Sequence, residues 1–319
     1  MSALPAYVEP LGDGIFCIDT GFHRPRFDAA YLLVHGGRAA FVDTGTNFAL
    51  PRLLGALDAL GVERQAVDWV IPTHVHLDHA GGAGALMREL PAAKMWVHPR
   101  GARHMIDPSA LFQGAAGVYG EAEVRRSYGE LVGVDVGRVV TSDDGMIIGL
   151  AGRPLKAIDT PGHARHHHCI WDETSRGWFT GDTFGMAYPE FIHPSYGPWM
   201  LPTTTPVQFD PEALRASIAR LVAAEPQSIF VTHYGRVQGI PARATQLLAV
   251  LDEMVAIGQA LRDAPDRDAR LRSELAALHA RCLQAHGLPA DERAAGLLAL
   301  DVELNAQGVA IWLDKEQRA

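Results

Sequence analysis

The chain has 319 residues, of which 48% are hydrophobic and 20% are charged, a composition typical of a globular protein rather than a disordered one. Its formal net charge of −9 disfavours nucleic acid as a partner, because proteins that bind phosphate backbones usually carry a basic surface. The three cysteines, Cys17, Cys169 and Cys282, are odd in number and far apart, so they predict neither a disulfide framework nor a cysteine zinc site. This favours a reducing compartment. With no signal-peptide pattern and no apolar run of roughly 20 residues, we expect a cytoplasmic protein that does not cross a membrane.

Short apolar segments bounded by turn residues predict a strand-rich first part of the chain. The pair Gly36-Gly37 lies between two of these segments and predicts a tight hairpin. Leucines at helical spacing predict a helix over 48–60 that ends at Gly61. The expected strands cover 7–8, 15–18, 30–34, 39–42, 67–72 and 94–97, and further helices cover 85–90 and 100–106.

The middle of the chain predicts loops and a short helix up to residue 136, followed by more strands. These strands cover 138–140, 146–148, 155–158, 168–171, 177–180 and 228–232. Residues 184–209 are rich in proline and aromatic residues without periodicity, which predicts a long surface loop, and Asp210-Pro211 predicts the start of a helix. After Pro241 leucines recur at helical spacing, so we expect a strand-rich domain over 1–240 and a helical C-terminal extension over 241–319.

The densest group of potential metal ligands is the segment Thr73-His74-Val75-His76-Leu77-Asp78-His79, which follows an apolar strand. Four such side chains within six residues cannot all face one way on a regular strand or helix, whereas a loop can converge them on a pair of ions. Chance histidines in a turn would explain one of these side chains but not four. The segment therefore predicts a metal site.

Three further strand ends carry His or Asp. Pro161-Gly162 forms a turn that presents His163, Gly181 precedes Asp182, and Thr232 precedes His233. Each of these is compatible alone with a structural residue, but together they are what a site at one edge of a sheet sandwich requires. Imidazole and carboxylate groups suit Zn²⁺, Fe or Mn²⁺, and the absence of cysteine ligands disfavours a closed structural zinc site.

The motifs His-X-His-X-Asp-His, Thr-Pro-Gly-His, Gly-Asp and Thr-His-Tyr-Gly, in this order, resemble those of the metallo-β-lactamase superfamily. The likeness is greatest to its glyoxalase II-like and lactonase-like metallohydrolases, and it covers roughly residues 10 to 240. The resemblance implies an α+β fold, a four-layer αββα sandwich, to which the helical extension is added.

The resemblance also implies two divalent metal ions, with zinc as the expected metal and iron or manganese as alternatives. Two cations a few Å apart would lower the pKa of a shared water molecule. Asp78 is in addition the candidate catalytic side chain, which would steer that water or accept its proton. The implied ligands are His74, His76 and His163 for one ion, Asp78, His79 and His233 for the other, and Asp182 as the bridge.

The segment Phe41-Val42-Asp43-Thr44-Gly45 resembles the superfamily turn whose Asp supports the metal site, although Asp43 as an ordinary turn residue is an equal alternative. We expect His167 to support a metal ligand, and His166 and His168 to lie at the surface or in packing. Asp159 would either accept a hydrogen bond from a ligand imidazole or close a turn.

The glycines that follow the histidine-rich segment, Gly81, Gly82 and Gly84, do not form a phosphate-binding loop, because neither GxGxxG nor a P-loop lysine is present. We expect them to let the backbone pass close to the metals. The aromatic residues of 184–209 would either line a substrate cleft or pack over the sandwich.

The resemblance implies a hydrolase that uses a metal-bridging hydroxide to cleave a small ester, thioester or lactone. Asp182 stands where the commonest class B β-lactamases carry cysteine, which disfavours β-lactamase activity. Two alternatives remain: a mononuclear iron oxygenase of the same fold, similar to persulfide dioxygenases, and a catalytically idle metal-binding scaffold. The expected partner is a small-molecule substrate, and we expect neither nucleic acid nor a membrane as a partner. The leucines of the C-terminal extension are also compatible with a homodimer.

Overall fold

In the computed structural model, which describes residues 4–317, strands and helices share the first 237 residues and helices alone follow. The strands are β1 (Val8–Gly12), β2 (Ile15–Asp19), β3 (Ala29–His35), β4 (Arg38–Val42), β5 (Val67–Ile71), β6 (Lys94–Val97), β7 (Val139–Thr141), β8 (Ile147–Leu150), β9 (Arg153–Asp159), β10 (His168–Asp172), β11 (Gly177–Gly181), β12 (Ile192–His193), β13 (Gly197–Pro198), β14 (Ser228–Val231) and β15 (Gly235–Val237). The α-helices are α1 (Leu50–Leu60), α2 (Leu77–Ala80), α3 (Ala83–Glu89), α4 (Pro99–Ile106), α5 (Ser109–Tyr119), α6 (Glu121–Tyr128), α7 (Pro211–Val222), α8 (Ile240–Leu261), α9 (Arg267–Ala285), α10 (Glu292–Leu297) and α11 (Ala299–Glu316).

The chain divides into two compact units. The first unit comprises Met1–Asp159, His166–Gly181 and Gln227–Arg236. The second unit comprises Thr160–Arg165, Asp182–Pro226 and Val237–Ala319. The C-terminal helices therefore share a unit with the long segment that follows β11 and with the short segment that follows β9.

The first unit is built on two sheets. One has seven strands in the order β1-β2-β3-β4-β5-β6-β7, in which β1 to β4 pair antiparallel and β4 to β7 pair parallel. The hairpin expected at Gly36-Gly37 joins β3 to β4, and both glycines adopt positive φ, which a side chain would disfavour. The other sheet has the order β15-β14-β11-β10-β9-β8, and β11 pairs parallel with β14.

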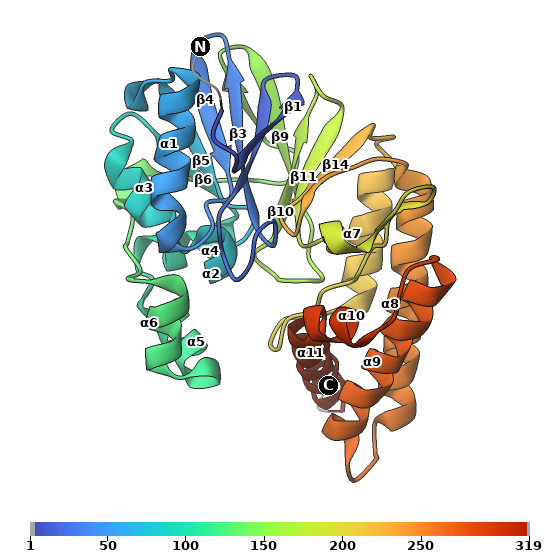
Figure 1. The fold of residues 1–319 in the computed structure, drawn as a ribbon. Helices are drawn as coiled ribbons and strands as arrows, with labels where there is room; N and C mark the ends of the chain where they lie inside the picture. Colours follow the sequence, from blue (N-terminus) through green and yellow to red (C-terminus); the bar gives the residue numbers. More distant parts are fainter. Residues whose placement is uncertain (1–3, 318–319) are drawn as a thin grey trace. The chain divides into compact units, whose positions relative to one another are not determined.

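The two sheets of the first unit enclose a hydrophobic core, in which Tyr31 of β3 meets Phe179 and Phe230 of the second sheet. The opposite face of the seven-stranded sheet packs on helices, through residues such as Leu53 and Leu86. Figure 1 shows α1 and α3 beside β4, β5 and β6. The unit thus contains a helical layer and two sheet layers. Strands such as β3 and β4 are apolar along most of their length because both faces of their sheet are covered.

In the second unit, the expectation of a long surface loop over 184–209 is wrong. Tyr188 and Trp199 are buried, and the Tyr188 hydroxyl donates a hydrogen bond to Asp301 of α11 at 3.0 Å. The side chain of Gln246 in α8 bonds both the amide and the carbonyl of Met200, at 2.9 and 2.8 Å. The segment lacks periodicity because its residues make individual contacts with helices. Most of its aromatic residues belong to a core, whereas Tyr196 is exposed.

Several elements differ from the sequence expectations in extent. Residues 109–128 form two helices, α5 and α6, rather than loops with one short helix. Asp78 and His79 lie in the short helix α2 rather than in a loop, and β15 follows the strand that we expected to be the last. Within the described residues the C-terminal extension contains four helices, where its leucine pattern predicts about three. Asp291 caps the separate helix α10 by accepting a hydrogen bond from the Ala294 amide.

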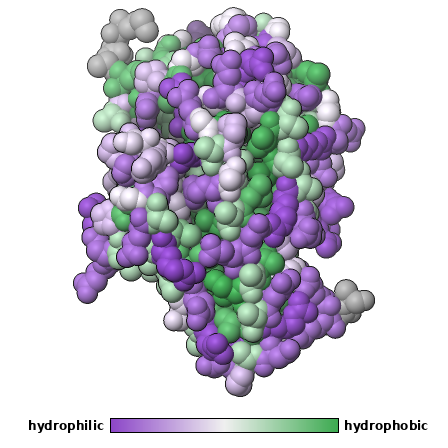
Figure 2. All heavy atoms as spheres, turned by 90° about the vertical axis from the view of Figure 1, so that its right-hand side faces the viewer, coloured by the Kyte–Doolittle hydropathy of each residue, from purple (hydrophilic) through white to green (hydrophobic). Residues whose placement is uncertain are grey.

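The long helix α8 is the one helix among the described residues that is long and apolar enough to cross a membrane by length and composition. Its Leu247, Leu251 and Met254 form a buried stripe, and 44% of its most apolar window is buried inside the protein. Figure 2 shows the face on the right of Figure 1, where apolar residues lie between borders of hydrophilic ones. The buried stripe of α8 is typical of a core helix in a helical unit.

His279 of α9 is buried in the second unit, 5.8 Å from the ring of Trp199. Neither ring nitrogen of His279 has a hydrogen-bond partner among the described residues. Burial lowers the pKa of His279 to about 4, because an imidazolium cation in this apolar surrounding would lose its hydration. His279 is therefore neutral in the folded protein at neutral pH.

We expect His279 to make the protein less stable in acid. Below the unfolded-state pKa of about 6.5 the unfolded chain binds a proton that the folded chain does not, so stability falls as the pH drops from 6.5 towards 4. Between pH 6.5 and pH 4 the free energy of unfolding falls by about 3 kcal/mol because of this histidine. His279→Leu should remove this part of the pH dependence. Denaturant unfolding at several pH values, in the presence of a chelator, measures the slope. The exposed His35→Gln is the control, and an unchanged slope in His279→Leu would contradict the assignment.

Candidate metal centre

The predicted ligands stand at the ends of strands or directly after them. His74 and His76 follow β5, His233 follows β14, and Asp182 follows β11 directly. His163 lies in the short segment after β9. Because neighbouring parallel strands end at the same edge of a sheet, strand ends are a common place for functional side chains. The fold therefore places these residues at or after strand ends, as the sequence predicted.

Asp43 connects the segments that carry the ligands in the first unit. Its side chain is fully buried, and it accepts hydrogen bonds from the Thr73 amide at 2.7 Å and from the Thr232 hydroxyl at 2.7 Å. It also accepts a hydrogen bond from Nδ1 of His79 at 2.9 Å. Asp43 itself has φ of +55°, a conformation that Asp tolerates better than most residues. Of the two alternatives for Asp43, the geometry favours support of the site.

One group of potential ligands lies entirely within the first unit. Asp78, His79 and His233 each offer one ligand atom, and these atoms lie within 4.8 Å of one another. Oδ2 of Asp78 is 3.4 Å from Nε2 of His233 and 3.8 Å from Nε2 of His79. His79 and His233 are buried, whereas the Asp78 side chain is partly exposed.

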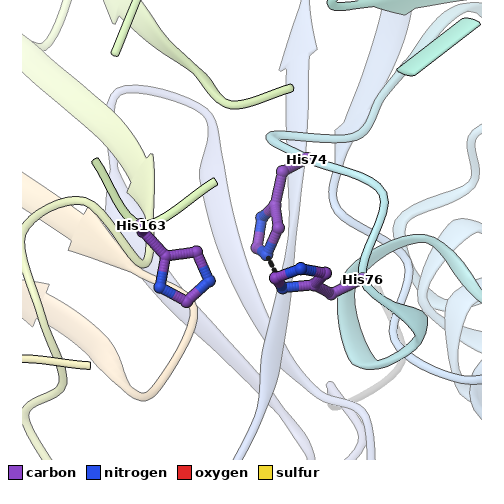
Figure 3. A group of neighbouring side chains, drawn as sticks. All are labelled: His74, His76 and His163. Atoms are coloured by element: carbon purple, nitrogen blue, oxygen red, sulfur yellow. Dashed lines mark hydrogen bonds between the residues drawn. The ribbon is translucent and has the colours of Figure 1, made fainter. Parts of the chain in front are cut away.

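A second arrangement involves the first two histidines of the motif. Nε2 of His74 lies 2.7 Å from Nδ1 of His76, and Figure 3 shows the two rings with this bond, together with His163. His163 and Asp182, which the motifs assign to the same metal centre, belong to the second unit, so their assignment together with His74, His76 and His79 stays a prediction.

His163 and Asp182 also contact each other, with Nε2 of His163 3.3 Å from Oδ2 of Asp182. Both side chains are buried. Nδ1 of His163 donates a hydrogen bond to the Thr203 carbonyl at 3.3 Å, which leaves Nε2 as the nitrogen directed to Asp182.

The hydrogen bonds of three histidines fit metal binding. Nδ1 of His79, His163 and His233 donates to Asp43, to the Thr203 carbonyl and to the Phe27 carbonyl, respectively. Each Nε2 then carries an electron pair and faces a carboxylate oxygen at 3.3 to 3.8 Å. A cation between them would satisfy both groups, and an acceptor on the far side of a ligand imidazole is the usual arrangement in metal sites.

The three histidines after the His163 segment are all buried, so the surface position considered for His166 and His168 is wrong. His168 donates from Nε2 to the Pro72 carbonyl at 2.8 Å and accepts the Ser142 hydroxyl at 2.7 Å. The ring of His167 stacks on His74, with 4.8 Å between centroids. His167 therefore packs against the predicted ligand His74. His168 holds the Pro72 carbonyl, two residues before His74, in place.

Asp159 accepts a hydrogen bond from Nε2 of His98 at 3.1 Å, a histidine that is not among the predicted ligands. At two of the glycines after the motif, backbone segments approach closely. A Cβ at Gly82 would lie 2.6 Å from the Thr46 carbonyl oxygen, and one at Gly84 would lie 1.7 Å from that of Val132. Both positions allow backbone segments of the first unit to approach closely.

Sequence reasoning missed the backbone acceptors, since the carbonyls of Phe27 and Thr203 carry no signal in residue type. It also missed Asp28, which is fully buried and accepts a hydrogen bond from the Thr20 hydroxyl at 2.7 Å. Burial raises the pKa of Asp28 to about 8, and the charges of His233 and His79 oppose this shift. In the sequence, the position of Asp28 directly after Phe27 is the feature that could have drawn attention to it.

The fold and the ligand groups agree with the comparison to known families. The sequence profile of the metallo-beta-lactamase superfamily matches residues 23–233, well over half of the chain. The chain therefore belongs to the metallo-β-lactamase superfamily, and its α+β fold is the one that the motifs predicted. Membership implies metal ions, for which the His and Asp groups supply ligands.

Relatives of this chain include thioesterases. Acyl-coenzyme A thioesterase MBLAC2 of Bos taurus is 30% identical over 202 residues, which are 57% of this chain and 68% of that protein. Atrochrysone carboxyl ACP thioesterase of Aspergillus fumigatus is 28% identical over 154 residues, 48% of this chain and 38% of that protein. A metallo-beta-lactamase family protein from Thermus thermophilus shares the fold, with a TM-score of 0.67, 21% identity, and coverage of 97% of this chain and 95% of that one.

We expect Asp43→Asn to weaken metal binding by about 10- to 100-fold, the usual effect of losing a partner that orients a ligand. The amide cannot accept from Thr73, Thr232 and His79 together, so the His79 ring loses its fixed orientation. Competition with a chelator measures the affinity. Asp68→Asn, which breaks only the ion pair with Arg38 at the surface, is the matched control and should leave metal affinity unchanged.

Proposed function

We propose that this protein is a metal-dependent thioester hydrolase with two divalent ions. The observation that carries the proposal is the set of neighbouring His and Asp groups in a chain of this superfamily. The thioesterase relatives support the reaction class. The number and identity of the ions belong to the proposal, with zinc as the expected metal and iron or manganese as alternatives.

The donor set suits such ions, because imidazole nitrogens and carboxylate oxygens bind Zn²⁺, Mn²⁺ and Fe²⁺. In the proposed assignment, which follows the motifs, His74, His76 and His163 would hold one ion, Asp78, His79 and His233 would hold the other, and Asp182 would serve as a ligand of both. Bound divalent cations lower the pKa of water and stabilise negative charge that develops on a carbonyl oxygen.

The protein's own residues keep the ligands in place and handle the proton. Asp43 holds His79 from behind, and the Phe27 carbonyl holds His233, so neither ring can rotate without losing a hydrogen bond. The Asp78 side chain is 26% exposed and Asp182 only 7%, so Asp78 is the carboxylate that can exchange a proton with solvent. We therefore assign to Asp78 the role of orienting the attacking water and accepting its proton.

The substrate class follows from what the two kinds of thioesterase relative share. Acyl-coenzyme A and acyl carrier protein both present the acyl group as a thioester of a phosphopantetheine thiol, so we propose this thioester as the substrate. The net charge of −9 does not oppose an anionic carrier, because bound cations dominate the local field. An ester or lactone substrate and an oxygenase are the alternatives that the assay must separate.

We expect the purified protein to hold two metal ions per chain, because each proposed ion has its own ligand group. Elemental analysis after reconstitution with Zn²⁺, Mn²⁺ or Fe²⁺ gives the stoichiometry. The metals should also raise the melting temperature, since a ligand that binds only the folded state stabilises it. A single ion per chain under all three conditions would contradict the dinuclear assignment.

The metal-loaded protein should hydrolyse acyl-coenzyme A, and the chelated protein should not. Asp182→Ala and His163→Ala should each reduce the rate by more than the roughly 10- to 100-fold typical of residues behind the ligands. His166→Ala, which removes a ring that packs 5.3 Å from His76, should have a smaller effect. Thiol release measured with a chromogenic reagent gives the rates, with His104→Ala on α4 as a control.

Three outcomes would replace the proposal. Hydrolysis of esters or lactones with no thioester turnover would change the substrate class. Oxygen consumption by an iron-loaded protein would favour the oxygenase. Two bound metals without turnover of any of these substrates would favour the metal-binding scaffold.

A further inference from the structure

The segment that carries His163 forms hydrogen bonds with other parts of the second unit. The Thr205 hydroxyl donates to the His163 carbonyl at 2.9 Å, and the Thr203 carbonyl accepts from Nδ1 of the His163 ring at 3.3 Å. At the flanking residue, the Gly162 carbonyl accepts from the Asp210 amide at 2.8 Å. The orientation of the His163 ring therefore depends on where residues 203 and 205 lie.

Asn305 of α11 fixes that position. Its side chain is 1% exposed, its Oδ1 accepts a hydrogen bond from the Thr204 amide at 2.9 Å, and its Nδ2 donates to the Pro202 carbonyl at 3.0 Å. The two bonds flank Thr203, whose own carbonyl holds His163. The buried carboxamide of Asn305 thus bonds one backbone amide and one backbone carbonyl of this segment, as a neighbouring strand would.

Helix α11 packs closely against residues 202–205. The Thr204 hydroxyl lies 3.3 Å from the Leu304 carbonyl oxygen, to which it donates. A Cβ at Gly308 would lie 2.0 Å from this hydroxyl and 3.0 Å from the Thr205 carbonyl oxygen. Glycine at position 308 therefore lets the helix approach closely enough for Asn305 to reach both backbone groups.

We propose that Asn305 is a positioning residue for His163: through residues 202–205 the C-terminal helix fixes the tautomer and the direction of this imidazole. With Nδ1 donating to Thr203, the ring presents the electron pair of Nε2 on the side of Asp182, 3.3 Å away. Loss of Asn305 frees the segment, so His163 loses its fixed acceptor. This inference rests on the proposed metal-dependent function, because it assigns His163 as a ligand.

The test compares Asn305→Ala, which removes both bonds, with Asn305→Asp, which keeps the acceptor for Thr204 and loses the donor to Pro202. The control is Val309→Ala, a fully buried residue of the same helix that destabilises α11 without bonding residues 202–205. All variants are the full chain, studied well below their melting temperatures. The first readout is Zn²⁺ affinity by chelator competition.

The expected result is a loss of about 10- to 100-fold in affinity for one of the two ions in Asn305→Ala, with a smaller loss in Asn305→Asp and none in Val309→Ala. The second readout needs no metal: nitrogen chemical shifts of the His163 ring, assigned with His163→Gln, report the tautomer. The wild type should hold the proton on Nδ1, and Asn305→Ala should show a mixture of tautomers.

The two readouts distinguish failure of this inference from failure of the proposed function. Equal losses of affinity in Asn305→Ala and Val309→Ala would reduce Asn305 to a stabilising residue and overturn the inference. An unchanged tautomer in Asn305→Ala would overturn it as well, even if thioesters are hydrolysed. A wild type that binds Zn²⁺ with the predicted Asn305 dependence but hydrolyses no thioester would support the inference and refute only the substrate class.

Discussion

The carboxylate of Asp43 is the interaction on which the arrangement of the first unit depends. It receives hydrogen bonds from the segment after β5, from α2 and from the segment after β14, which are far apart in the sequence. With the Thr73 hydroxyl, four buried donors bond to this one buried carboxylate. These bonds are strong because the surroundings exclude water, and each donor would be costly if left unsatisfied. The same bonds that join these segments also set the direction of His79.

The candidate ligands could be named from the sequence because their signal is local, and their role in binding metal stays a prediction. His74, His76, Asp78 and His79 lie within six residues, and His163, Asp182 and His233 each follow a strand with apolar periodicity. The Gly36-Gly37 hairpin and the helix that ends at Gly61 were predictable for the same reason, since turn residues act within a few positions.

The features that were missed depend on contacts between distant residues. The sequence of residues 184–209 predicted a surface loop because it has no periodicity, yet Tyr188 bonds to Asp301 and Met200 to Gln246. The acceptors behind His163 and His233 are backbone carbonyls, which every residue has, so no residue type could reveal them. The buried state of His166 and His168 was likewise invisible, because histidine is common both inside proteins and on their surfaces.

The bonds between α11 and residues 202–205 also have a consequence for biosynthesis. Thr204 and Asn305 are 101 residues apart, so during synthesis the His163 segment emerges from the ribosome long before α11, the helix that fixes this segment. The group formed by Asp78, His79 and His233 does not wait for that helix, because its supports, Asp43 and Phe27, are made earlier. Maturation of the nascent chain therefore has a built-in order, in which α11 completes the surroundings of a histidine synthesised much earlier.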